Sequence, residues 1–279
     1  MDQVPDSHIC PVTTIIVTHN SQTVFARCLA AIEAQTHLPE QVIVVDSGSE
    51  DCSYLQPIRD KSRYLLHTTD NIGFAAANNL GIKRATRASR YLLFLNPDAF
   101  LAPSTLAVAV DIMEEKTGAA ILGGRLRGCD SDTGVATGRL DSTGIFRKWY
   151  GRWYDRGQGE RDDASYRTPQ QVPALCGAFL FCRRQALESE LPNLFDESFF
   201  LYKEDIDLCL RIRRRGWQCL YDPALEILHC RGWSNDRRQM SRSQRLLAAR
   251  NEVRLTIKHR SPYLVWALSK YLLVRVVDV

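Results

Sequence analysis

The sequence predicts an α/β fold built around a mostly parallel sheet. Through the first 126 residues, short apolar segments typical of buried strands alternate with segments whose apolar residues recur at helical spacing. Such alternation is typical of βαβ units, which bring their strands side by side in parallel. The 279 residues, 45% hydrophobic and 24% charged, suffice for one large domain or two modest ones with a buried core.

Five strands and three helices are expected in this first half. The strands are read from apolar runs that end in polar or glycine-containing loops, within residues 12–20, 41–51, 63–73, 90–98 and 119–126. The first helix begins after Ser21, a typical N-cap residue. The second spans residues 74–86 and tolerates Gly81 among its alanines. The third spans residues 103–116, with proline in its first turn.

The second half departs from this regular alternation. Residues 127–171 are rich in Gly, Asp, Arg and aromatic residues without clear periodicity, which indicates a long excursion of loops. Order returns with a strand over 172–184, and a helix then begins near Glu204 and ends at Gly216, a typical C′ glycine. One or two strands are expected within 218–230, and helix after them.

This pattern divides the chain into a main domain and an extension. We assign residues 1–240 to the main domain, with 1–126 as its ligand-binding half and 127–240 as its catalytic half. Residues 241–279 form a basic and apolar helical extension. Its segment 262–277 would be roughly 24 Å long as a helix, short of the ~30 Å hydrocarbon core of a bilayer. Attachment to an anionic membrane and packing against the domain or a second copy of the chain both remain open.

Charge and cysteine usage bound the partners and the compartment. The net charge is only +4, but nine Lys and Arg stand against two acids between Arg231 and Arg260. That excess favours an acidic partner, such as anionic lipid or a phosphorylated substrate, over nucleic acid. The N-terminus is no signal peptide, and no run of about 18 apolar residues predicts a membrane span. The nine cysteines lack metal or redox spacing, which predicts free thiols in a reducing cytoplasm.

Polar side chains follow four of the predicted strands at their carboxyl ends. They lie at residues 18–20, 46–49, 71–73 and 96–98. Ligands of open α/β sheets bind beyond the carboxyl ends of the strands, so these residues should surround one crevice. None of the loops has the glycine pattern that cradles phosphate. Their carboxylates suit a ligand read through hydroxyl and N–H groups, with a divalent cation on its phosphates.

Each of these residues also has a simpler structural interpretation. Asp46 can close an Asx turn, and Asp98 can serve in a turn or cap the following helix. Glu204 and Asp205 can complement a helix dipole. The apolar approach "SFFLY" before this pair nevertheless predicts raised pKa values, as a catalytic base needs. His229 ends an apolar strand, where a histidine is often a packed core residue.

Three further residues are candidates for contact with a ligand. Gly177 interrupts a predicted strand, which marks either a bulge or the close approach of a ligand. Trp149 and Trp153 are spaced like a sugar-stacking surface in the long excursion, and ordinary packing explains them equally well.

Taken together, the motifs resemble the inverting family 2 glycosyltransferases of the GT-A fold, particularly their rhamnosyltransferase-like subset. The resemblance covers about residues 12–235. It rests on the segments TIIVTHNS, VIVVDSGSED, NIGFAAANNLGI, FLNPDAF, GAFLFCRR, FDESFFLYKEDIDLCLRIRRRGW and ILHCRGWS. Any one of these is weak evidence, whereas the series in this order and spacing is specific.

The resemblance implies a role for each matching residue. Asp98 and His229 would hold Mg²⁺ or Mn²⁺, with Asn96 in place of the first Asp of the family's D-x-D motif, where an amide is a poorer ligand. Asp205 would be the catalytic base, with Glu204 as the alternative. The acceptor would be bordered by Gly177, Trp149 and Trp153. The residues that would line the nucleotide and donor-sugar pocket are Thr18, Asn20, Asp46, Ser47, Asn71, Gly73, Asn79, Asn96 and Asp98.

The implied reaction is inverting transfer of a sugar, preferably rhamnose, in cell-surface polysaccharide synthesis. The donor would be a nucleoside-diphosphate sugar, with dTDP-rhamnose favoured over a UDP-sugar, and the acceptor a saccharide or lipid-linked saccharide. The expected place is the cytoplasm or the inner face of the plasma membrane. One rival is a sugar nucleotidyltransferase. Such an enzyme needs a basic, glycine-rich loop after the first strand, and the segment THNSQTVF at that place is neither basic nor glycine-rich. The other is a non-catalytic sugar- or nucleotide-binding module, disfavoured by the acidic pair and slightly favoured by Asn96.

Overall fold

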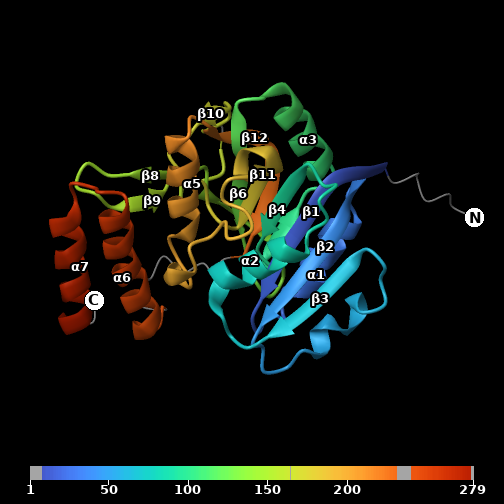
Figure 1. Cartoon of the computed structure of the whole chain (residues 1–279), viewed down its shortest axis with the longest axis horizontal. Helices are drawn as coiled ribbons and strands as arrows, with labels where there is room; N and C mark the ends of the chain where they lie inside the picture. The colour runs from blue at the N-terminus through green and yellow to red at the C-terminus, as the bar shows by residue number, and fades with distance from the viewer. Residues whose placement is uncertain (1–7, 164, 231–239, 278–279) are drawn as a thin grey trace, which may run out of the picture.

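The computed structural model describes residues 8–163, 165–230 and 240–277, and its centre is a ten-stranded sheet (Figure 1). The sheet order is β10-β12-β6-β11-β4-β1-β2-β3, with β5 paired to β12 and β7 paired to β6. The strands are β1 (His8–Thr18), β2 (His37–Ser47), β3 (Tyr64–Thr69), β4 (Tyr91–Leu95), β5 (Ala99–Leu101), β6 (Ala119–Cys129), β7 (Ala136–Ser142), β10 (Gln170–Gln171), β11 (Phe179–Arg183) and β12 (Gln218–His229). A separate hairpin joins β8 (Ile145–Arg147) to β9 (Trp153–Asp155).

Helices surround this sheet and continue beyond it in the C-terminal pair (Figure 1). They are α1 (Phe25–Glu33), α2 (Gly73–Arg84), α3 (Thr105–Glu115), α4 (Arg184–Leu187), α5 (Glu204–Arg214), α6 (Arg242–Lys258) and α7 (Leu264–Val277), with 3₁₀ turns η1 (Ser53–Ile58) and η2 (Glu197–Phe199). β1 runs parallel to β2 and β4, β2 to β3, and β6 to β12. The predicted α/β fold with a mostly parallel sheet is therefore confirmed.

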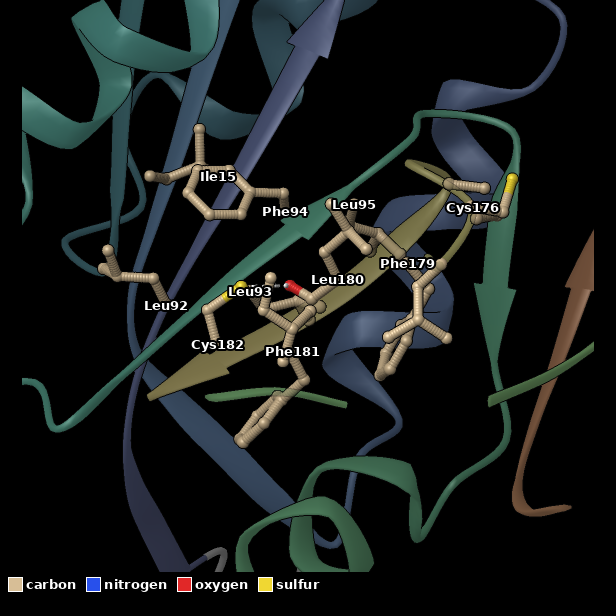
Figure 2. Packing of buried hydrophobic residues seen from close by; sticks show 14 of the residues in the cluster. Ile15, Leu92, Leu93, Phe94, Leu95, Cys176, Phe179, Leu180, Phe181 and Cys182 are labelled. Carbon is tan, nitrogen blue, oxygen red and sulfur yellow. Dashed lines mark hydrogen bonds between the residues drawn. The ribbon is translucent and has the colours of Figure 1, made fainter. Parts of the chain in front are cut away.

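The core lies where β4 passes between β1 and antiparallel β11 (Figure 2). All five residues of β4 are buried, which explains why this strand reads as a continuous apolar run instead of alternating. The ring of Phe94 meets Phe195 edge to face with centroids 4.9 Å apart, and Tyr91 stacks on Phe181 at 5.1 Å. Burying each such side chain contributes roughly 1.5–3 kcal/mol, so the strand that leads to Asp98 is firmly anchored.

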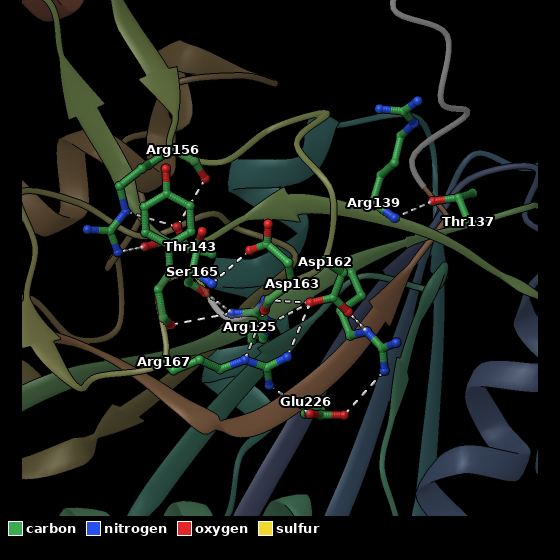
Figure 3. A network of polar contacts seen from close by, with 12 residues as sticks. Arg125, Thr137, Arg139, Thr143, Arg156, Asp162, Asp163, Ser165, Arg167 and Glu226 are labelled. Atoms are coloured by element: carbon green, nitrogen blue, oxygen red, sulfur yellow. Dashed lines mark hydrogen bonds and ion pairs between the residues drawn. The ribbon is translucent and has the colours of Figure 1, made fainter.

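The excursion over residues 127–171 is more ordered than the sequence indicates, since it contains β7, β8, β9 and β10. Its anchor is Arg125 of β6, whose side chain is fully buried (Figure 3). The Arg125 guanidinium pairs with Asp162 and donates to the carbonyl oxygens of Asp163 at 3.0 Å and Ser165 at 2.8 Å. Specific polar contacts with Arg125 of β6 hold this excursion in place. Because no apolar stripe does so, its short strands show no hydrophobic period in the sequence.

Two predicted helix starts lie too early in the chain. The first helix begins at Phe25, because the carbonyl of Ser21 accepts the N–H groups of Val24 and Phe25 in a preceding turn. The third begins at Thr105, two residues beyond Pro103. The predicted end of α5 is confirmed, since Gly216 follows it with φ of +87°.

The prediction that all cysteines are free is wrong for one pair. A disulfide joins Cys129, the last residue of β6, to Cys230, which directly follows β12. The two cysteines lie 101 residues apart, so only the parallel pairing of β6 with β12 brings them together. The other seven cysteines form no disulfide with one another.

The extension is helical, as predicted, and packs on the main domain. α6 starts with a capping box in which Ser241 and Gln244 satisfy each other's backbone N–H groups. The buried amide of Asn251 donates to three carbonyls just before α5, and Glu252 pairs with Lys203. In the described ranges no helix has the length and apolar character needed to cross a membrane. Of the basic stretch, Arg231, Arg237 and Arg238 lie outside those ranges.

Candidate active site

The carboxyl ends of β1 and β2 meet at Asp46, which pairs in register with Thr18. The Asp46 side chain is 1% exposed and accepts hydrogen bonds from the Thr18 hydroxyl at 2.9 Å, the Tyr54 hydroxyl at 2.9 Å and the Ser49 N–H at 3.0 Å. Burial acts to raise the pKa of Asp46, but the bonds from Ser49, Tyr54 and Thr18 outweigh it and lower that pKa. The Asp46 carboxylate therefore closes the turn after β2, as its structural interpretation predicts, and orders that loop.

That loop is tied to the ends of β1 and β3. Asn20 adopts φ of +49°, donates its N–H to the Ser49 hydroxyl at 2.8 Å and accepts from the Glu50 N–H at 2.9 Å. The Ser47 hydroxyl accepts the N–H of Ile72 at 3.1 Å. The predicted nucleotide-pocket residues of the first three strand ends therefore form one connected rim.

The start of α2 is shaped by close packing against the segment before α5. Gly73 has φ of +81°, and an added Cβ would lie 2.4 Å from the ring of Phe200, so a glycine is required there. The side-chain oxygen Oδ1 of Asn71 accepts a hydrogen bond from the Gly73 N–H at 3.2 Å. Asn79 is fully buried, and its amide bonds to both backbone groups of Phe195 at 2.8 and 2.9 Å. Asn79 thus holds the segment that leads to α5 against α2.

Asp98 and His229 lie side by side because β5 pairs with the end of β12, where Ala99 stands opposite His229. The His229 Nε2 is 3.4 Å from Asp98 Oδ1, and His229 Nδ1 is 2.7 Å from Asp141 Oδ2. Burial opposes charge on this imidazole, but the Asp98 and Asp141 carboxylates outweigh it and raise the His229 pKa to about 9. Asp141 fixes the ring so that Nε2 faces Asp98, the arrangement usual for a ligating histidine.

The donor atoms around Asp98 fit a divalent cation. His229 Nε2 meets the Asp98 carboxylate only at 3.4 Å, and the buried Oδ1 of Asn96 has no hydrogen-bond partner among the described residues. A carboxylate, an imidazole nitrogen and an amide oxygen form a mixed set that Mg²⁺ or Mn²⁺ accepts. Within the described ranges no three His, Cys, Asp or Glu side chains form a ready metal cluster.

Glu204 and Asp205 begin α5 and differ in accessibility. Glu204 is 5% exposed, and its Oε2 finds no partner in the part of the chain that is described. Burial, followed by the charge of Asp205, raises the pKa of Glu204 to about 8. Asp205 is half-buried, and burial raises its pKa above the ordinary range against a hydrogen bond from the Gly177 N–H. The predicted rise in both pKa values is confirmed, and Asp205 is the more exposed of the two residues.

Gly177 lies against this carboxylate. Its N–H donates to Asp205 Oδ2 at 3.0 Å, and an added Cβ would stand 3.4 Å from the Cβ of Asp205. Gly177 lies in the turn before β11 and not within a strand as predicted, and the group that approaches it closely is Asp205. Asp207, two residues further, pairs with Arg211 at 2.8 Å, as its i,i+4 spacing suggests.

The two tryptophans of the excursion occupy different environments. Trp153 is partly covered by the Arg147 guanidinium, 5.4 Å from its ring. Trp149 lies in the turn between β8 and β9 and is 85% exposed. Neither the Arg147–Trp153 contact nor the exposure of Trp149 places these rings beside Asp205 or Asp98.

Sequence reasoning missed two residues that position the site. Asp141 lies in the excursion without any motif, within the mostly polar sequence of residues 138–143, so nothing in the sequence marks it. Asn251 lies in α6, where nothing in the sequence connects it to the segment before α5. Its amide donates to the carbonyls of Phe199 at 2.7 Å, Leu201 at 2.8 Å and Tyr202 at 3.0 Å.

Comparison with known proteins is consistent with this arrangement. The sequence model described as glycosyl transferase family 2 matches residues 13–191. The N-acetylglucosaminyl-diphospho-decaprenol L-rhamnosyltransferase of Mycobacterium tuberculosis is 27% identical over 80% of this chain and 77% of its own length. The rhamnosyltransferase WbbL of Escherichia coli is 24% identical over 77% of this chain and 81% of its own.

A solved structure shares the architecture. The mannosyltransferase PcManGT from Pyrobaculum calidifontis, in complex with GDP-Man and Mn²⁺, superposes with a TM-score of 0.60 at 19% identity. The superposition covers 96% of this chain and 76% of the mannosyltransferase. Likeness at this level of identity shows the fold, which is the GT-A fold expected from the sequence motifs.

Proposed function

Because the chain belongs to glycosyl transferase family 2, and is therefore a glycosyltransferase, we propose that it transfers rhamnose with inversion from a nucleoside-diphosphate sugar, preferably dTDP-rhamnose. The proposed acceptor is a lipid-linked saccharide of cell-surface polysaccharide assembly. The rhamnosyltransferase names of its relatives support this choice of sugar. The decaprenol in one of those names supports a lipid-linked acceptor. We infer that the protein reaches this acceptor from the inner face of the plasma membrane.

The observation that carries the proposal is the pair at the start of α5. Glu204 is sealed from solvent, whereas Asp205 is more exposed and its carboxylate is held by the Gly177 N–H. We assign Asp205 as the base that takes the proton of the acceptor hydroxyl while the hydroxyl oxygen attacks the anomeric carbon. The bond to the diphosphate breaks on the opposite face, which inverts the configuration. General base catalysis of this kind typically contributes 10²–10⁴-fold in rate.

The donor side is assigned to the strand ends. Asp98, His229 and Asn96 would hold Mg²⁺ or Mn²⁺, and Asp141 would orient His229. When bound, the cation neutralises charge on the leaving diphosphate. The connected rim formed by Thr18, Asn20, Asp46, Ser47, Asn71 and Gly73 would seat the nucleotide. The Asp46 carboxylate would act there through the Ser49 and Tyr54 hydroxyls that it holds.

The test is release of nucleoside diphosphate from a panel of nucleotide sugars with Mg²⁺ or Mn²⁺ and a lipid-linked or short-chain saccharide acceptor. We expect release with dTDP-rhamnose and a fall of about 10²–10⁴-fold in Asp205→Asn. Asp98→Ala should lose metal-dependent turnover. Asp132→Asn, which alters an exposed carboxylate in the excursion, serves as the matched control and should keep full activity.

Three outcomes would reject parts of this proposal. Turnover with another donor sugar but not with dTDP-rhamnose would reject the sugar. Full activity in Asp205→Asn would reject the base. Donor binding without release under every acceptor would favour a non-catalytic binding module over an enzyme.

A further inference from the structure

The outward face of α7 is an apolar stripe. We call Val265, Leu268, Leu272, Leu273 and Val276 the α7 stripe, and these side chains are between 42% and 78% exposed. Four of them follow the spacing i, i+3, i+7 and i+11, which aligns them along one side of a helix. The only polar side chain among them, Ser269, turns its hydroxyl back to the Val265 carbonyl at 2.9 Å. Ala267 and Val274, on the other side of α7, are buried.

Trp149 extends this surface from a distant part of the sequence. The turn between β8 and β9 lies beside the start of α7 (Figure 1), where the Tyr150 ring is 5.8 Å from the Trp266 ring. Trp149 packs on Tyr150 with centroids 5.4 Å apart and leaves its indole 85% exposed. An exposed indole at the edge of an apolar stripe is typical of proteins that bind the interface of a bilayer.

The charge around the α7 stripe is almost entirely positive. Arg242, Arg250 and Arg275 lie beside the described part of α7, whereas Lys258 and Lys270 pair with acids on the domain side. Arg275 stands at the edge of the stripe, and the Arg242 guanidinium reaches its carbonyl at 3.2 Å. The turn that carries Trp149 adds Arg147 and Lys148. A partner for this surface must therefore offer both apolar contact and negative charge.

We propose that the α7 stripe and Trp149 dock on an anionic lipid bilayer, with α7 lying in the plane of the interface. This docking proposal rests on the proposed function, because a lipid-linked acceptor lies in the membrane on which α7 would dock. The 14 described residues of α7 are roughly 21 Å long, and no helix among the described residues is long and apolar enough to cross a membrane. A second copy of the chain would set this cationic surface against itself, whereas anionic lipid offers the opposite charge.

The docked surface adjoins the catalytic segment. α6 contacts α7 on one side (Figure 1), and its Asn251 holds the carbonyls of residues 199–202 on the other. Asp205 follows that segment directly. Docking through α7 would thus leave one helix, α6, between the docked helix and the segment before Asp205, without inserting any part of the sheet.

The experiment is co-sedimentation of the full chain with vesicles of POPC containing POPG, without donor or acceptor. We expect binding that falls at least about tenfold when POPG is omitted, since each Lys or Arg near an anionic surface adds to the attraction. The double variant Leu268→Glu/Leu272→Glu should lose at least about tenfold in vesicle binding, and Trp149→Ala should bind more weakly than the wild type. Val135→Glu, at an exposed apolar residue outside the stripe, is the matched control and should bind normally.

Two results would overturn the proposal. Equal vesicle binding by the wild type and the double variant, or none by either, would reject docking through the α7 stripe. A wild-type dimer that becomes monomeric in the double variant, with no vesicle binding, would assign the stripe to a second copy. Turnover of a short-chain acceptor in detergent-free solution is measured separately. It should be retained in the double variant, so that failure of docking and failure of the proposed reaction are told apart.

Discussion

Glu204→Gln tests whether the sealed carboxyl at the start of α5 is kept protonated. Its pKa is raised by burial, and next by the charge of Asp205, from 4.5 to about 8. A folded-state pKa above the unfolded value stabilises the fold fully below pH 4.5, and this contribution is lost as the pH rises towards 8. Glutamine, which does not titrate, removes this loss at nearly constant shape.

The size of the effect follows from the shift. A rise of about 3.5 units corresponds to about 4–5 kcal/mol at 1.36 kcal/mol per unit. A chain of this size gains about 2 °C in Tm per kcal/mol, so the Tm of the variant relative to wild type should rise by up to about 8–10 °C between pH 4.5 and pH 8.5. Any constant cost of burying the glutamine N–H groups cancels in this difference.

The assay is thermal unfolding of both proteins across that pH range. Glu188→Gln, at an exposed carboxylate, is the control and should run parallel to the wild type. A difference between Glu204→Gln and wild type that stays constant with pH would refute the reasoning, because it would show that Glu204 ionises equally in the folded and unfolded chain.

Three further predictions concern the contacts that hold the site. Asn251→Leu leaves three backbone carbonyls before α5 without their donor, so we expect a loss of about 2–4 kcal/mol and a lower kcat at similar donor KM, measured by denaturant unfolding and steady-state kinetics. Arg125→Met leaves Asp162 with weaker partners and should cost about 3 kcal/mol of unfolding free energy. Asp207, whose pKa is lowered to about 2 because bonds from His259, Arg211 and Lys258 outweigh its burial, stabilises the fold above pH 3.8. Asp207→Asn should therefore cost about 2–3 kcal/mol at pH 7 and flatten the acid unfolding curve as the pH falls from 4 to 2.

Matched surface changes serve as controls for these three variants. Asn193→Leu, Arg87→Met and Asp60→Asn make the same chemical replacements at exposed residues. Each should stay within about 0.5 kcal/mol of wild type. A buried variant that is no less stable than its exposed counterpart would contradict the contact assigned to it.

The sequence by itself determined the alternation of strands and helices, and with it which polar residues reach the site. The apolar run of β4 is followed by Asn96 and Asp98. Because a parallel sheet places the carboxyl ends of its strands on one edge, these two residues could be expected at the site. The raised pKa values of Glu204 and Asp205 could also be predicted, since two adjacent carboxylates follow an apolar approach. These features are local, and periodicity or turn chemistry within about ten residues encodes them.

Only the tertiary structure decided which distant groups meet. Asp141 reaches His229 across 88 residues, and Cys129 meets Cys230 across 101, because β6, β7 and β12 are neighbours in the sheet. Asn251 supports the segment before Asp205 from a helix that, by its sequence, could equally have been an independent extension. Specific polar contacts of this kind carry no period, so the fold must form before they can be identified.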